Sequence, residues 1–276
     1  MDDTTDVVSG ERAVARSPEE VVAPLGRLLP PAYADGVAAP RPSPADAERV
    51  AFEVFTQGPV EMPSPEGLSA LWIFWGQFLD HDIGLSPEQE GPEAEFIKFE
   101  GPGAPFNVLR SEIAEGTGTA GVPAEQVNAV TPLVDASQIY GSDLSRQQAL
   151  RTLEGGRLKA QPGPDGVDLP PDAAQVFGSA AGATGAEGFT AGDLRAQENS
   201  GLAALHALWI NEHNHWADRF AAAHPGWTDE QVFQAARAAV EALVQRISYE
   251  AFLPLLIGDA IAPFDGHDPE ADPRLV

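Results

Sequence analysis

Three segments of the chain place apolar side chains at intervals of three and four residues, which is the spacing of one face of an α-helix. They cover residues 65–80, about 198–223 and 228–247. Few runs of alternating apolar and polar residues remain, so strand signals are too scarce for a large sheet. We therefore predict a mainly α-helical fold with long ordered loops and no internal repeat.

Two further helices are indicated by local signals. Ser43 followed by Pro44 is typical of a helix N-terminus and predicts a helix through residue 56. A short helix is expected over residues 143–154, where it is followed by two glycines. Residues 86–125 are expected to be mostly loop, and residues 127–143 to form an ordered, extended loop. Residues 155–192 are expected to form a long loop or a mobile flap.

Two of the long helices are preceded by residues typical of a helix N-terminus. Ser64 and Pro65 repeat the Ser-Pro pair and are expected to open the helix over residues 65–80. Thr228 and Gln231 match a capping box, in which each side chain bonds the backbone N–H of the other residue.

The charge balance argues against several classes of partner. The 276 residues include 42 acidic and 16 basic side chains, a formal net charge of -26 at pH 7, which disfavours nucleic acid and anionic membranes. The chain has no cysteine, so disulfides, thiolate nucleophiles and iron–sulfur clusters are excluded. No signal peptide is visible, and no apolar stretch reaches the ~20 residues of a membrane helix. We expect a soluble chain, cytoplasmic or exported by a non-classical route.

A histidine between two aspartates lies at the end of the first long helix. The run WGQFLDHD places Asp80, His81 and Asp82 in succession, with Gln77 four residues before the histidine and on the same helical face. Carboxylates control the proton affinity and orientation of an imidazole, so the group suits acid–base chemistry or metal binding. A polar helix end in an acidic chain gives the same pattern, and both interpretations stay open.

The segment TPLVDAS places Thr131, Leu133, Asp135 and Ser137 at every second position, so an extended backbone would point them to one side. Hydroxyl, carboxylate and carbonyl oxygens are the ligands of hard cations such as calcium. Calcium needs more oxygens than these residues supply, and a further carboxylate such as Asp82 would complete the site. The alternative is an ordinary turn whose side chains bond one another.

Arg195 and Glu198 precede the second long helix. A glutamate at a helix N-terminus is favourable to the helix dipole whatever its function. His206 and His213 follow on roughly one face of this helix. His213, Asn214 and His215 could suggest a metal site, but three successive polar residues on a helix point to different sides and usually indicate hydrogen bonding or solvent contact.

Four separated motifs resemble the animal-type haem peroxidase family, which includes myeloperoxidase, lactoperoxidase and peroxidasin. They are WGQFLDHD, TPLVDASQIYGSD, AGDLRAQE followed by LHALWINEHN, and ALVQRISYEAFLPLLIG, in the order in which the family carries them. The resemblance covers roughly residues 23–276 and implies a helical peroxidase architecture. Residues 1–22 are expected to be a disordered N-terminal arm.

The resemblance implies a role for each residue of the first and third motifs. His81 matches the distal histidine, Gln77 its helical neighbour that holds distal water or halide, and Arg195 the distal arginine. Asp80 and Glu198 match positions that form ester bonds to haem methyl groups in mammalian members. Haem b is the implied cofactor, and hydrogen peroxide with a small reducing donor are the implied substrates.

A calcium site is also implied by the resemblance. Asp82 matches the calcium-ligand aspartate beside the distal histidine, and the other matching ligands are Thr131, Leu133, Asp135 and Ser137. Calcium would tie the helix to the loop and fix the position of the histidine.

The sequence departs from the family at two places. Asn199 stands where myeloperoxidase has the methionine of a sulfonium link to haem, so that link is not expected. The proximal histidine of the family, the axial haem ligand, lies beyond a segment resembling FDGHDPEADPRLV, at which this sequence stops. We therefore expect a partial domain that lacks the C-terminal proximal half, with the axial ligand supplied by a missing C-terminal segment or a second chain.

Two functions remain as expectations. The first is a haem-dependent peroxidase that reduces hydrogen peroxide and oxidises a halide, pseudohalide or small organic donor. The second is a calcium-stabilised, non-catalytic binding or interaction domain derived from a peroxidase. A non-haem metal hydrolase is disfavoured, because the sequence has no His-x-x-x-His pair to seed such a site.

Overall fold

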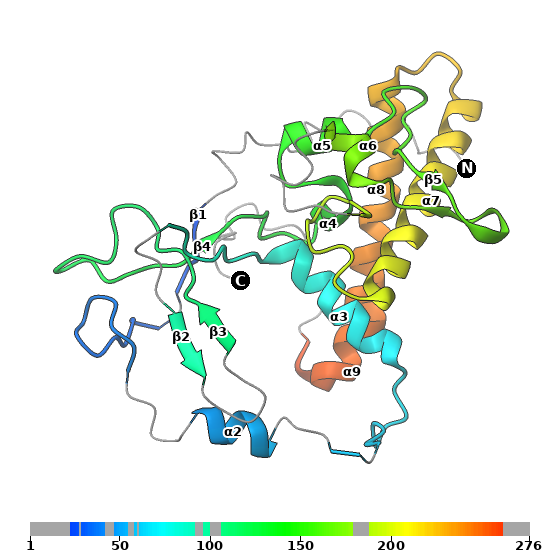
Figure 1. Cartoon of the computed structure of the whole chain (residues 1–276). Helices are drawn as coiled ribbons and strands as arrows, with labels where there is room; N and C mark the ends of the chain where they lie inside the picture. The colour runs from blue at the N-terminus through cyan, green and yellow to red at the C-terminus, as the bar shows by residue number, and fades with distance from the viewer. Residues whose placement is uncertain are drawn as a thin grey trace. The chain divides into compact units, whose positions relative to one another are not determined.

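The structure is a computed structural model, and it describes residues 23–27, 29–41, 47–54, 58–59, 61–91, 96–99, 106–178 and 188–261 (Figure 1). The arm expected over residues 1–22 and the sequence after residue 261 lie outside the described residues. Contacts divide the described chain into two compact units. The helical unit holds residues 70–84 and 130–261, and the hairpin unit holds residues 23–69 and 85–129, with the gaps given above.

Three long helices form the frame of the helical unit. They are α3 (Ala70–Ile83), α7 (Ser200–Ala223) and α8 (Asp229–Ile247), with α7 packed along α8 and α3 packed on α7 (Figure 1). After α8 the backbone continues through a π-helical segment, η4 (Ser248–Phe252), into α9 (Leu253–Ile257) and a 3-10 turn, η5 (Gly258–Ala260). Shorter elements fill the connections: α4 (Ser137–Tyr140), α5 (Leu144–Leu150), η1 (Pro164–Gly166), α6 (Ala173–Phe177) and the antiparallel strands β5 (Gln161–Pro162) and β6 (Asp168–Leu169). The predicted mainly helical fold is confirmed.

The hairpin unit contains two antiparallel strand pairs and a helix, α2 (Ala47–Val54), that lies within the helix predicted through residue 56. The pairs are β1 (Ala23–Pro24) with β4 (Val127–Asn128), and β2 (Phe96–Phe99) with β3 (Phe106–Leu109). The segment over residues 86–125, predicted to be mostly loop, thus also contains two strands that were not predicted. The sequences FIKF and FNVL of β2 and β3 are rich in aromatic and β-branched residues, which favour strands.

The N-termini of the two longest helices follow their capping chemistry. The side-chain oxygen of Thr228 accepts the backbone N–H of Gln231 at 3.3 Å, and the Gln231 side chain accepts the backbone N–H of Thr228 at 2.9 Å. This is the predicted capping box at the start of α8. At the start of α7 the side-chain oxygen of Asn199 accepts the N–H of Leu202 at 2.8 Å, so the helix begins at Ser200 rather than at residue 198.

The predicted start of α3 is wrong. Ser64 and Pro65 form a turn, in which the carbonyl oxygen of Ser64 accepts the backbone N–H of Gly67 at 3.0 Å. Gly67 has a φ of 69°, a left-handed conformation that a right-handed helix does not contain. The helix therefore begins at Ala70, and it extends to Ile83, beyond the predicted end at residue 80.

Two segments predicted as loops contain short regular elements. The segment over residues 127–143 turns into α4 after Ala136, whose φ of 59° bends a backbone that was expected to be extended. The segment over residues 155–192 contains η1, α6 and the β5–β6 pair. The short helix predicted over residues 143–154 ends at Leu150.

The core of the helical unit lies where α3, α7 and α8 meet. Phe78 of α3 is fully buried, and its ring stacks on that of Trp209 of α7 with centroids 6.4 Å apart. Phe233 and Val240 of α8 are also fully buried. Each such side chain stabilises the fold by about 1.5–3 kcal/mol. This packing fixes the position of α3 relative to α7. The predicted site residues lie on or beside these two helices. Among the described helices, none has the length and apolar content of a membrane span.

Candidate functional site

His81 is buried near the end of α3 between two carboxylates. Only 3% of its surface is exposed, with Nδ1 lying 3.8 Å from Oδ1 of Asp193 and Nε2 lying 3.9 Å from Oε2 of Glu198. Burial lowers the pKa of His81 below its ordinary value, and the charge of Arg195 lowers it further, against the opposing effect of the two carboxylates. The imidazole is therefore neutral at pH 7, the form that can accept a proton.

Arg195 is held by the buried carboxylate of Asp193. Its Nε donates to Oδ1 at 2.9 Å and its Nη2 donates to Oδ2 at 2.8 Å, while Nη2 also donates to the carbonyl oxygen of Gly84 at 2.9 Å. Burial alone would raise the pKa of Asp193, but the hydrogen bonds and charge of Arg195 hold it below its ordinary value. The Asp193 side chain is only 1% exposed and faces both Arg195 and His81.

Asp193 was missed as a site residue from the sequence. It lies two positions before the arginine in AGDLRAQE, a spacing that allows a side chain to bond a nearby backbone N–H. Its Oδ1 does accept the backbone N–H of Arg195 at 2.8 Å. The contact with His81 depends on packing between distant segments, so local spacing alone could not have found it.

The backbone around Asp193 is fastened to α4. Gly192 donates its N–H to the carbonyl oxygen of Ile139 at 3.0 Å, and Asp193 donates its N–H to that of Gln138 at 2.9 Å. A Cβ at Gly192 would collide with the carbonyl oxygen of Ser137, so only glycine allows this approach. The close approach places the Asp193 carboxylate beside His81.

A chain of side-chain hydrogen bonds joins α3 to the start of α7. Asn199 donates from Nδ2 to Oε1 of Gln77 at 2.8 Å, and Gln77 donates from Nε2 to Oε2 of Glu198 at 2.8 Å. The Glu198 side chain is 49% exposed, and Asp80 is also exposed. The structure therefore brings Gln77, His81 and Glu198 together, with the exposed Asp80 immediately beside the histidine in sequence.

Asp82 lies on the other side of His81 in sequence and is fully buried. Its carboxylate accepts the backbone N–H of Ala136 at 3.1 Å, the N–H of Ser137 at 2.6 Å and the hydroxyl of Ser137 at 2.9 Å. Burial raises the pKa of Asp82 well above its ordinary value, and the negative charge of Asp135 raises it further. A cation at this position would relieve both effects.

The remaining residues of the predicted calcium site lie around Asp135. The hydroxyl of Thr131 donates to its Oδ1 at 2.8 Å, and the backbone N–H of Ser137 donates to the same oxygen at 3.1 Å. The side chain of Leu133 has no polar atom, so only its backbone carbonyl oxygen could serve as a ligand. Arg237 of α8 places Nη2 3.7 Å from Oδ2 of Asp135, which supplies some of the positive charge that a cation would bring.

The cluster fits a hard cation by its chemistry. Asp82, Thr131, Asp135 and Ser137 present carboxylate and hydroxyl oxygens and are linked by the hydrogen bonds given above. The described residues contain no group of three or more His, Asp or Glu side chains placed to hold a metal. A cation here would therefore depend on two carboxylates supplemented by hydroxyl and carbonyl oxygens.

The other cluster fits one side of the expected haem group. Peroxide chemistry needs a base that can take and return a proton and a positive group that stabilises developing negative charge. The neutral buried imidazole of His81 and the half-buried guanidinium of Arg195, held by the buried Asp193, are groups of these two kinds. An axial ligand is not evident among the described histidines. His213 uses both ring nitrogens internally, bonding the hydroxyl of Tyr140 and the carbonyl oxygen of Gly156 at 2.9 Å each. His267 lies outside the described residues.

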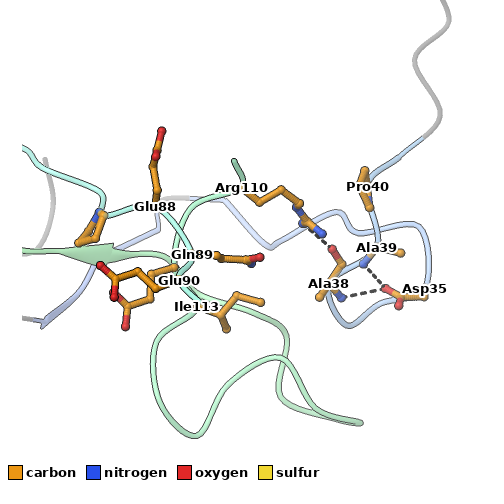
Figure 2. A pocket seen from close by; sticks show the side chains of 11 residues that line it. Asp35, Ala38, Ala39, Pro40, Glu88, Gln89, Glu90, Arg110 and Ile113 are labelled. Carbon is orange, nitrogen blue, oxygen red and sulfur yellow. Dashed lines mark hydrogen bonds between the residues drawn. The ribbon is translucent and has the colours of Figure 1, made fainter. Parts of the chain in front are cut away.

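An open cavity of about 680 Å³ belongs to the hairpin unit and contains none of the predicted site residues. Figure 2 shows Arg110 donating to the carbonyl oxygen of Ala38, and Asp35 accepting the backbone N–H of Ala38 and Ala39. The bonds of Asp35 lower its pKa, the backbone N–H of Val37 contributing most. These contacts are typical of a turn that one carboxylate stabilises, and they indicate no chemistry at the cavity. The candidate functional site is therefore formed by the two clusters of the helical unit.

Known proteins match the chain over most of its length. The sequence model described as animal haem peroxidase matches residues 19–275. Thyroid peroxidase of Sus scrofa is 30% identical over 311 residues, which cover 91% of this chain and 33% of that protein. Lactoperoxidase of Mesocricetus auratus is 28% identical over 304 residues, which cover 91% of this chain and 42% of that protein.

A solved structure shares both fold and sequence similarity with the chain. Peroxidase A from Dictyostelium discoideum superposes with a TM-score of 0.72 at 27% identity, over 85% of this chain and 49% of that chain. The chain thus spans about a third of the length of the thyroid peroxidase and about half of the Dictyostelium structure. Because the family match extends over nearly the whole sequence, the chain belongs to the animal haem peroxidase family.

Proposed function

We propose that residues 23–276 form part of a haem peroxidase domain that carries the distal side of the haem site. The complete enzyme would reduce hydrogen peroxide and oxidise a halide, pseudohalide or small organic donor. The observation that carries the proposal is the buried neutral His81, which lies between Asp193 and Glu198 with Arg195 beside it. Family membership gives the reaction class.

His81 would move the proton in the peroxide reaction. Its neutral imidazole accepts the proton of the peroxide at one oxygen and returns it to the oxygen that leaves as water. Nε2 is the nitrogen for this step, because it faces the half-exposed Glu198 whereas Nδ1 faces the buried Asp193. Lowering of the pKa by burial keeps the nitrogen unprotonated before the step.

Arg195 would stabilise negative charge as the oxygen–oxygen bond breaks. A guanidinium stays protonated throughout, and the bidentate bond to Asp193 holds it in one orientation. Gln77 would hold Glu198 beside His81 through its hydrogen bond, and Asn199 would hold Gln77. A positional error of an ångström in such groups costs about 100-fold in rate, which gives these supporting bonds a function.

Haem b would supply the oxidising chemistry when bound. Asp80 and Glu198 would be the carboxylates at its edge, since both are exposed and flank the histidine. Calcium would bind Asp82, Thr131, Asp135 and Ser137 with the carbonyl group of Leu133, and would join α3 to the segment before α4. Covalent attachment of haem through the two carboxylates is part of this proposal.

The axial side of the haem would come from a further segment or a second chain. Several large apolar side chains are exposed on α3, α7 and α9 of the helical unit, namely Leu71, Ile73, Leu208, Leu255, Leu256 and Ile257. Exposed apolar side chains favour a covering partner where they adjoin one another. Sedimentation velocity tests this: a chain that stays monomeric and does not aggregate at high concentration would argue against a covering partner.

A second candidate function is a calcium-stabilised binding or interaction domain without catalysis. It is favoured by the oxygen cluster around Asp82, which is assembled within the described residues, whereas the axial ligand of a haem is not. Binding of calcium with no uptake of haem under any condition would support this function.

Peroxide-dependent oxidation of a chromogenic donor tests the first function. Haem is added to the full chain with and without free imidazole, which can stand in for an axial ligand. The variants are His81→Ala and, as a matched control, His215→Ala, which removes an exposed histidine of α7. We expect His81→Ala to lower kcat/KM by about 100-fold or more and His215→Ala to leave it unchanged. Equal activity of the two variants would contradict the role of His81.

A further inference from the structure

His206 is a histidine of α7 whose ring is buried with no hydrogen-bond partner in the described part of the chain. It is 0% exposed, and neither of its ring nitrogens is paired among the described residues. Its ring meets that of Phe78 edge-on, with centroids 5.2 Å apart. His213 on the same helix shows the usual arrangement, because both of its nitrogens are bonded. A buried imidazole with no hydrogen-bond partner lowers the stability of the fold, so its missing partner needs an explanation.

The neighbours of His206 include further buried polar atoms that are unpaired. Phe78, whose ring His206 meets, lies three residues before His81 on α3 and therefore on the same side of that helix. The charges of Asp193 and His81 both act on the pKa of His206, in agreement with this position. Nδ1 of His81 also has no hydrogen-bond partner in the described part of the chain. Its distance of 3.8 Å from Oδ1 of Asp193 is too long for a direct hydrogen bond.

Gln138 adds a third unpaired group beside the same residues. Its side-chain Nε2 donates to the backbone carbonyl oxygen of Phe78 at 3.2 Å. Its backbone carbonyl oxygen accepts the backbone N–H of Asp193. Its Oε1 is buried and has no partner among the described residues. Polar atoms of three fully or almost fully buried side chains thus remain unpaired around Phe78 and Asp193.

We propose that a buried water molecule joins His206 to His81 and Asp193, and that His206 is a positioning residue for His81. The water would accept the Nδ1 proton of His81 and donate to Oδ1 of Asp193 and to a ring nitrogen of His206. Buried waters typically make about three such bonds to groups that have no other partner. Nδ1 of His81 and Oδ1 of Asp193 lie 3.8 Å apart, and a water molecule placed beside this line can form a hydrogen bond with both atoms.

The water-mediated bond would select one tautomer of His81. The hydrogen bond made by one ring nitrogen decides which nitrogen carries the proton. With the proton held on Nδ1, the lone pair lies on Nε2, which faces Glu198. The link to catalysis rests on the proposed function, whereas the bound water and the tautomer do not depend on haem.

The test compares His206→Phe with His206→Gln in the full chain without haem. Denaturant unfolding and the ¹⁵N chemical shifts of the His81 ring are measured, with His81→Ala used to assign the signals. We expect His206→Phe to raise the unfolding equilibrium constant about tenfold and to reduce the population of the Nδ1-protonated tautomer of His81. His206→Gln, which keeps a donor and an acceptor, should restore part of both. His215→Gln should change neither.

Two results would overturn the inference. Unchanged or higher stability of His206→Phe would mean that the imidazole lies in a dry apolar site. Lower stability with an unchanged tautomer of His81 would mean that His206 is structural only. If His206→Phe does not fold, nuclear Overhauser effects between water and the ring N–H protons of the native chain decide: their presence supports the bound water, and their absence refutes it. Failure to bind haem affects none of these measurements.

Discussion

Asp193 and Arg195 form a bidentate ion pair although only one residue separates them in sequence. Both carboxylate oxygens accept hydrogen bonds from the guanidinium, at 2.9 and 2.8 Å, and the carboxylate is 1% exposed. The same carboxylate lies 3.8 Å from Nδ1 of His81. The pair therefore orients the arginine and sets the charge beside the histidine at the same time.

Loss of the arginine should leave a buried charge unpaired. We expect Arg195→Gln to destabilise the chain by about 3 kcal/mol in urea unfolding at pH 7, because Asp193 loses its counter-ion. Arg195→Lys restores the charge without the bidentate geometry and should recover part of this loss. A loss below about 0.5 kcal/mol in Arg195→Gln would show that the pair contributes little.

Gly192 should be the glycine of this region that tolerates substitution least. A side chain there would collide with the backbone of Ser137 and Gly141, so we expect Gly192→Ala to cost about 2–3 kcal/mol. Gly226→Ala is the matched control, since a Cβ at Gly226 meets no atom within 4 Å. Thermal unfolding of the two variants measures the difference, and equal melting temperatures would contradict the close packing described above.

Calcium should stabilise the folded chain through Asp82. A ligand that binds the folded state alone at 100 times its Kd stabilises by about 2.7 kcal/mol, so we expect millimolar calcium to raise Tm by several degrees. Asp82→Ala should abolish the rise, whereas Asp218→Ala, at an exposed aspartate of α7, should keep it. The measurement is calorimetry with and without a chelator. A rise of the same size in Asp82→Ala would place the calcium elsewhere.

His213 should make stability fall on acidification. Burial lowers its pKa from 6.5 to about 4, so the unfolded chain binds the proton first as the pH falls. The contribution is complete above pH 6.5 and decreases between pH 6.5 and about 4, by up to about 1.4 kcal/mol per pH unit. Urea unfolding across this range should give a smaller slope in His213→Gln than in the native chain. An identical dependence of stability on pH in the two chains would mean that His213 has the same pKa in the folded and the unfolded state.

Helix type could be predicted from the sequence, because it depends on local spacing. The capping box of Thr228 and Gln231 is one example, and Gln77 with His81 on one helical face is another. The roles of the candidate site residues came from the resemblance to the family and stay predictions. The start of α3 could not be placed, since Ser64 and Pro65 suit a turn as well as a helix N-terminus and the left-handed Gly67 decides between them.

Contacts between segments that are distant in sequence could not be predicted from the local spacing of residues. Asp193 meets His81 only after Gly192 packs on α4, and no pattern within AGDLRAQE indicates this. His206 resembles any core histidine in sequence, and only the folded structure shows that its nitrogens have no hydrogen-bond partner among the described residues. The calcium interpretation assumed an extended segment, whereas Ala136 turns the backbone so that Ser137 reaches Asp82.

Absorbance titration with haem tests the central proposal most directly, namely that His81 forms the distal side of a haem site. The full chain is titrated with calcium and imidazole present, alongside His81→Ala and His215→Ala. We expect a shifted Soret band in all three and a loss of the further spectral change on peroxide addition in His81→Ala alone. A Soret band that does not shift in the native chain, or one that responds to peroxide equally without His81, would contradict the proposal.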